Sequence, residues 1–177
     1  ARDYLDVYDR AGGLGPRSVL AHAIHLSDAE LGRLVASGSR IAHCPVSNLF
    51  ISSGVMPLAK YLEAGASLGL GSDVAGSPEL SILTQMRTAF YAQNAYRVAT
   101  GDRRPIVEPL GLLRLGTLDG ARALGLDRVT GSIEVGKEAD LIARTLSVAS
   151  VVLEGLALKA RRDARGVHRP LDVEVPG

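Results

Sequence analysis

The sequence has little of several things, and each shortage excludes a class of protein. Its 177 residues include a single cysteine, Cys44, so no internal disulfide can form and a reducing, cytoplasmic compartment is expected. It has no tryptophan and only 4% aromatic residues, poor material for a platform that stacks nucleic-acid bases. A net charge of +1 gives no field that would attract nucleic acid or an anionic membrane. No run of about 18 apolar residues is present, so no membrane span is expected.

What the chain does contain is a repeated order of apolar runs and amphipathic stretches. Each of three short apolar runs is followed by a polar or glycine-containing loop and then by a helical pattern. The apolar runs are 18–23, 40–43 and 66–71, and the helices expected after them are 28–36, 57–64 and 79–98, with a loop over 46–54. Strands that alternate with helices predict βαβ units, a parallel sheet and an α/β fold.

The last part of the chain has weaker patterns. Two short helices are expected at 109–115 and 118–124. The character of the sequence changes from residue 144, where the apolar stretch 146–158 favours a helix. The basic stretch 159–169 is typical of a solvated face.

Three ionisable residues lie at or just after the ends of the predicted strands: His22, His43 and Asp73. The carboxyl ends of parallel strands meet at one edge of a sheet, which is where such folds place their chemistry. Imidazole and carboxylate groups suit a divalent ion such as zinc, so the pattern indicates a metal or proton-transfer site. The residues alone leave a second interpretation open, in which each side chain is an ordinary core or loop residue with satisfied hydrogen bonds.

Three residues near His43 have side chains that could take part in chemistry: Cys44, Ser47 and Asn48. Adjacent residues on a strand face opposite sides, so Cys44 beside His43 is expected to be a buried thiol rather than a nucleophile. Ser47 and Asn48 have side chains that suit polar groups of a substrate, although capping of the loop explains them equally well.

Four stretches resemble one protein family. They are VLAHAIHLS at 19–27, AHCPVSNL at 42–49, GLGSDVAG at 69–76 and GSIEVGKEADL at 131–141. Together they are similar to the amidohydrolase superfamily, and most similar to its guanine deaminase branch, alongside the adenosine-derivative deaminases and triazine chlorohydrolases.

The resemblance implies a (β/α)₈ TIM barrel that carries a small β-sandwich. A whole barrel takes about 250 residues, so the chain is expected to be the C-terminal portion of such an enzyme. Strands six to eight would be 18–23, 40–43 and 68–72. Residues 1–128 would then be the C-terminal part of the barrel and 129–177 a β-sandwich remnant, with a tail from 144 that does not resemble the family's strands.

The resemblance also assigns roles to residues. Asp73 would be the strand-eight carboxylate that binds a catalytic zinc or iron and takes a proton from the bound water. His22 would be the strand-six histidine at the metal, and His43 and Asn48 would line the substrate pocket. The family's His-x-His pair, its strand-five histidine and the glutamate three residues later are not found in this sequence. An incomplete site, without turnover by this chain alone, is therefore expected.

The implied reaction is hydrolytic deamination of a purine-type base, guanine to xanthine and ammonia first. Deamination of methylthioadenosine or adenosylhomocysteine, triazine hydrolysis, and a non-catalytic remnant that binds a partner remain alternatives. The implied partners are a purine-like small molecule and the missing N-terminal half of the barrel. Full-length members of the family are expected to be homo-oligomers.

Overall fold

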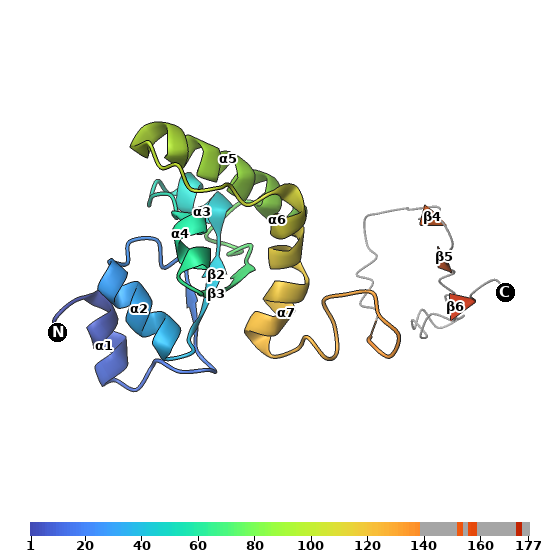
Figure 1. Ribbon diagram of the computed structural model, residues 1–177, viewed down its shortest axis with the longest axis horizontal. Helices are drawn as coiled ribbons and strands as arrows, with labels where there is room; N and C mark the ends of the chain where they lie inside the picture. The colour runs from blue at the N-terminus through green and yellow to red at the C-terminus, as the bar shows by residue number, and fades with distance from the viewer. Residues whose placement is uncertain (139–151, 154–155, 159–172, 175–177) are drawn as a thin grey trace. The chain divides into compact units, whose positions relative to one another are not determined.

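A computed structural model describes residues 1–138, 152–153, 156–158 and 173–174. The chain forms two units, Ala1–Ser132 and Ile133–Gly177. The first unit contains a small parallel sheet with helices packed against it (Figure 1). The predicted α/β class and parallel pairing are therefore confirmed.

A three-stranded parallel sheet is the centre of the first unit. Its strands are β1 (Val19–Ala21), β2 (Arg40–His43) and β3 (Ser67–Leu70), paired in the order β1-β2-β3. In this register the carboxyl ends of the strands lie at one edge. Strand β1 is shorter than the predicted run because His22 has a φ of 62° and leaves the extended conformation.

Seven helices are described in the first unit. They are α1 (Tyr4–Arg10), α2 (Asp28–Ala36), α3 (Pro45–Phe50), α4 (Leu58–Glu63), α5 (Ile82–Thr100), α6 (Pro109–Gly116) and α7 (Leu118–Leu124). The predictions for α2, α6 and α7 are confirmed. Helix α5 begins three residues later than predicted because the Ser81 hydroxyl accepts a hydrogen bond from the Thr84 N–H, which caps the helix at that point.

The segment predicted as a loop after β2 is in fact helical in its first part. Pro45 occupies the first helical position, where its fixed φ favours a helix and its missing N–H has no partner to lose. The loop prediction for 46–54 was therefore wrong up to Phe50, and this correction matters because α3 carries two residues of the site described below.

The core of the first unit is a cluster of leucines and other apolar side chains around the sheet. Ile41 and Leu68 on neighbouring strands pack with Leu34 and Tyr61 from α2 and α4, and all four are almost completely buried. Strand β3 and α7 approach so closely at Gly69 that a Cβ there would lie 2.8 Å from the Cα of Gly120. Two glycines let backbone meet backbone at this contact.

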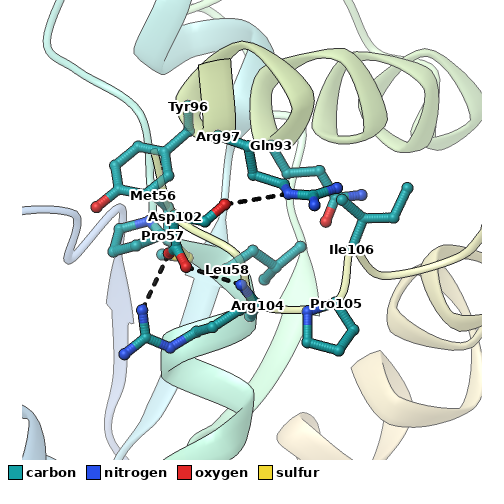
Figure 2. A pocket seen from close by; sticks show the side chains of 11 residues that line it. Met56, Pro57, Leu58, Gln93, Tyr96, Arg97, Asp102, Arg104, Pro105 and Ile106 are labelled. Atoms are coloured by element: carbon teal, nitrogen blue, oxygen red, sulfur yellow. Dashed lines mark hydrogen bonds and ion pairs between the residues drawn. The ribbon is translucent and has the colours of Figure 1, made fainter. Parts of the chain in front are cut away.

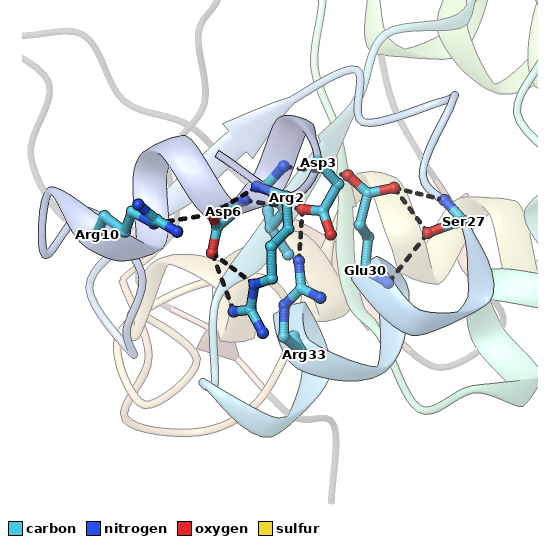
Figure 3. A network of polar contacts seen from close by, with 8 residues as sticks. Arg2, Asp3, Asp6, Arg10, Ser27, Glu30 and Arg33 are labelled. Carbon is cyan, nitrogen blue, oxygen red and sulfur yellow. Dashed lines mark hydrogen bonds and ion pairs between the residues drawn. The ribbon is translucent and has the colours of Figure 1, made fainter.

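The buried carboxylate of Glu30 joins α2 to α1, and a second buried carboxylate, that of Asp6, is held within the N-terminal segment (Figure 3). Glu30 accepts hydrogen bonds from the N–H of Leu5, at 3.1 Å, and from the N–H and hydroxyl of Ser27, at 2.9 and 2.7 Å. The hydrogen bonds from Ser27, then that from Leu5, lower the pKa of Glu30 to about 2. Asp6 is held in the same way by the N–H and guanidinium of Arg2, which lower its pKa to about 2.

The second unit contains a small antiparallel sheet in its described residues. Its strands are β4 (Val152–Leu153), β5 (Leu156–Leu158) and β6 (Val173–Glu174), in the order β4-β5-β6. The helix predicted over 146–158 is wrong at these strands, and its other residues lie outside the described part of the chain. The tail from 144, which was expected not to resemble the family's strands, contains these three short strands. No helix among the described residues has the length and apolar character needed to cross a membrane.

Candidate active site

The fold brings two of the predicted site residues together at the carboxyl edge of the sheet. His22 directly follows β1, and Asp73 follows β3, with β2 between the two strands. The His22 Nε2 atom lies 3.7 Å from the Asp73 Oδ2 atom, and both side chains are about one third exposed, at 36% and 32%. Each residue has a positive φ, 62° and 49°, a backbone conformation that a non-glycine residue rarely adopts. Such conformations cluster at functional sites.

Helix α3 holds His22 in one orientation. The Asn48 Oδ1 atom lies 2.8 Å from the His22 Nδ1 atom, and Asn48 is only 1% exposed. An amide oxygen only accepts hydrogen bonds, so this contact places the imidazole proton on Nδ1. In the neutral ring the lone pair is then on Nε2, the nitrogen that faces Asp73.

The residue before Asn48 holds Asp73. The Ser47 hydroxyl donates to Asp73 Oδ2 at 2.5 Å, and Ser47 is completely buried. Gly76 closes over the same carboxylate, where an added Cβ would lie 2.5 Å from Oδ2. From the sequence, Ser47 was expected to contact a polar group of the substrate or to cap the loop, and its bond to Asp73 was missed. The available signal was that two polar residues, Ser47 and Asn48, follow each other directly after a strand. Its meaning was missed because this segment was predicted to be a loop.

His43 ends the middle strand β2 and Cys44 follows it, and both residues are buried. His43 is 3% exposed, and burial, with a smaller contribution from His22, lowers its pKa to about 4, so the ring is neutral at pH 7. Its Nδ1 atom and the Nδ2 atom of Asn48 have no hydrogen-bond partner among the described residues. Burial and the nearby carboxylate of Asp73 raise the pKa of Cys44 to about 11. The prediction of a buried thiol is confirmed.

Two hollows elsewhere in the first unit do not belong to this site. A cavity of about 10 Å³ lies between α4, α5 and the loop that contains Asp102 and Arg104 (Figure 2). It has room for about one water molecule. A wider hollow of about 180 Å³ is lined by residues such as Leu62, Leu115 and Arg122 near the start of β3. Neither is lined by His22 or Asp73.

The exposed pair fits part of a metal site. An imidazole nitrogen with a free lone pair and a carboxylate are both zinc ligands, and two ligands of one zinc ion, each about 2.0–2.2 Å from it, lie less than about 4.4 Å apart. The separation of His22 Nε2 and Asp73 Oδ2 is 3.7 Å, within that limit. No group of three or more histidine, cysteine or acidic side chains placed to hold a metal occurs in the described part of the chain. Further ligands would have to come from outside it.

Comparison with known proteins gives a consistent result. The model of the amidohydrolase family matches residues 1–159. A probable guanine deaminase of Deinococcus radiodurans is 44% identical over 142 residues, which cover 80% of this chain and 31% of that protein.

Solved structures give the same pattern. A guanine deaminase from E. coli superposes with a TM-score of 0.71 at 35% identity, covering 78% of this chain and 31% of that one. An adenosine deaminase from Xanthomonas campestris with bound zinc superposes with a TM-score of 0.68, also at 35% identity, covering 77% and 30% of the two chains. The chain therefore spans about a third of the length of the proteins it matches.

Proposed function

This chain belongs to the amidohydrolase family, and from that premise we propose that it is the C-terminal part of a metal-dependent purine deaminase, with guanine as the substrate. The observation that carries the proposal is the pair formed by His22 and Asp73, 3.7 Å apart at the carboxyl edge of a parallel sheet. The guanine deaminase relatives in the comparison support the choice of substrate.

The proposal includes the finer architecture inferred from the sequence. Strands β1, β2 and β3 correspond to strands six, seven and eight of a (β/α)₈ barrel, and the missing N-terminal strands would pair with the open edges of this sheet. Residues 1–128 are the barrel part and 129–177 the β-sandwich remnant. The complete enzyme is a cytoplasmic homo-oligomer that binds a purine.

Zinc is the proposed metal, because the exposed pair suits it and a structural neighbour has it bound. His22 through Nε2 and Asp73 through its carboxylate would hold the ion. When bound, a zinc ion supplies a water molecule whose pKa is near 7, and therefore a hydroxide nucleophile at neutral pH.

The side chains of this chain have separate tasks in the proposed reaction. Asp73 accepts the proton of the attacking water at Oδ1, since its Oδ2 receives the Ser47 hydroxyl. His22 would present Nε2 to the metal ion, because Asn48 fixes the opposite nitrogen of the ring. The water oxygen bonds to the ring carbon that carries the amino group, and the bond between this carbon and the amino nitrogen breaks. Guanine and water thereby give xanthine and ammonia.

His43 and Asn48 enter the proposal with a narrow role. Both are buried, at 3% and 1% exposure, and Asn48 already holds His22 through its oxygen. A contact of Asn48 with the substrate would therefore have to come from its Nδ2 atom, which has no partner among the described residues, and His43 would contribute a ring nitrogen.

An adenosine derivative is the second candidate substrate, because a structure that superposes almost equally well is an adenosine deaminase. A chimera distinguishes the two substrates. It joins the N-terminal part of the Deinococcus radiodurans relative to this chain at the start of the matched region. Ammonia release from guanine and from 5′-methylthioadenosine is then measured with the zinc-loaded protein.

We expect release from guanine, and loss of that activity by about 100- to 1,000-fold in Asp73→Ala, on the scale of about 3–4 kcal/mol for a group that acts in the transition state. Asp28→Ala is the matched control, because Asp28 is an exposed carboxylate that pairs with Lys60 on the helix surface. Activity on 5′-methylthioadenosine alone would establish the second candidate. Retained activity in a folded, zinc-loaded Asp73→Ala chimera would overturn the assignment of Asp73.

A further inference from the structure

Helix α3 supports the site but does not cap itself. It has only six residues, and no side chain at its own N-terminus makes a capping hydrogen bond. The first N–H groups of a helix have no partner within the helix, and burial without a partner costs free energy comparable to a lost hydrogen bond. The first such donor in α3 is Val46, because Pro45 has no N–H.

A side chain from a distant helix provides the missing acceptor. The Gln85 Oε1 atom on α5 accepts a hydrogen bond from the Val46 N–H at 3.2 Å. Gln85 is completely buried, and its Nε2 atom has no partner among the described residues. An apolar side chain would avoid that unpaired nitrogen, so what the amide contributes at this position is its oxygen on α3.

The next two residues of α3 are those that hold the exposed pair. Ser47 donates to Asp73, and Asn48 accepts from His22. A shift of the first turn of α3 moves both contacts together. We propose that Gln85 is a positioning residue: by capping α3 from α5 it sets Ser47 and Asn48, and through them the orientation of Asp73 and His22.

Two substitutions on the same helix test this. Gln85→Met keeps the length of the side chain and removes the acceptor. Gln93→Met is the matched control, because Gln93 is also a buried glutamine on α5 and its amide bonds the backbone of Val107, at 2.8 Å for each contact, away from α3. Each variant loses a buried amide, but only the first loses support for α3.

The direct measurement is the tautomer of His22, read by ¹⁵N NMR on the 177-residue chain at pH 8 without metal. We expect the proton on Nδ1 in the wild type and in Gln93→Met, and a mixture of tautomers in Gln85→Met. Asn48→Leu, which removes the acceptor itself, gives the signature of the lost bond. A proton that stays on Nδ1 in Gln85→Met overturns the proposal, and so does an equal change in Gln93→Met.

The consequence for catalysis rests on the proposed function and is measured separately in the chimera. Loss of a supporting contact behind a metal ligand typically costs 10–100-fold in activity, so we expect kcat to fall at least about tenfold in Gln85→Met. KM for guanine and the kcat of Gln93→Met should stay unchanged. An inactive wild-type chimera would refute the proposed function and leave the NMR result standing. An unchanged kcat in Gln85→Met would refute the positioning role.

Discussion

Replacing Glu30 by alanine tests the link between α1 and α2 that Figure 3 shows. The substitution removes both carboxylate oxygens and leaves the N–H groups of Leu5 and Ser27 without their acceptor. Glu30 is only 6% exposed, so water replaces its bond from Leu5 poorly. The Leu5 N–H is buried, and a buried donor left unsatisfied costs about 1–3 kcal/mol, whereas water can reach the exposed Ser27. We therefore expect the free energy of unfolding to fall by about 1–3 kcal/mol.

The measurement is urea unfolding followed by circular dichroism at pH 7. Glu63→Ala is the control, because the Glu63 carboxylate is 55% exposed and its ion pair with Arg104 is on the surface. Exposed pairs contribute about 0–1 kcal/mol. A loss below 1 kcal/mol in Glu30→Ala, or one no larger than in Glu63→Ala, would refute the reasoning.

The same variant predicts a pH dependence with a definite sign. The pKa of Glu30 is about 2 in the folded chain against an ordinary value of 4.5. A carboxyl group with a depressed pKa stabilises the fold fully above its ordinary pKa and loses that contribution as the pH falls through the folded value. The difference between wild type and Glu30→Ala should therefore be constant above about pH 5 and shrink toward pH 2. A difference that grows on acidification would contradict this.

Three further predictions concern packing, the thiol and the metal. Gly69→Ala should lower the free energy of unfolding by about 1–3 kcal/mol, because the added Cβ would lie 2.8 Å from Gly120. Gly32→Ala, with no atom within 4 Å of the new Cβ, should not destabilise the chain, and an equal loss in both would show that β3 and α7 do not meet as described. The pKa of about 11 predicts that Cys44 reacts with a thiol reagent at pH 8 about 100-fold more slowly in the folded chain than in urea. Equal rates would show an exposed thiol. The 177-residue chain alone should bind less than one zinc ion per molecule by elemental analysis and release no ammonia from guanine, and full occupancy with turnover would contradict an incomplete site.

The elements that the sequence predicted well are those with strong local signals. Helix α2 begins where Ser27 and Glu30 form a capping box, and β2 ends where Cys44 and Pro45 stop the run. Helix α3 was missed because its six residues contain no amphipathic repeat and its cap comes from Gln85, far along the chain. The strands at 152–153 and 156–158 were predicted as helix because an apolar run without period-two alternation fits either element.

For the candidate site, too, one part could be predicted from the sequence and another could not. The chemical types and strand-end positions of His22 and Asp73 were enough to predict that they meet. The buried contacts that orient them could not be predicted from the sequence. Ser47 contacts Asp73 and Asn48 contacts His22 from a short helix, α3, which was expected to be a loop. A loop would leave their directions undefined.

The most direct test of the account is a crystal structure of the zinc-loaded chimera, with anomalous diffraction recorded at the zinc edge. We predict a zinc peak about 2.0–2.2 Å from a carboxylate oxygen of Asp73 and from Nε2 of His22. The Nδ1 atom of His22 should remain hydrogen-bonded to Asn48. A zinc ion bound elsewhere in a folded chimera, with neither side chain in contact with it, would contradict the claim that these two residues form part of a metal site.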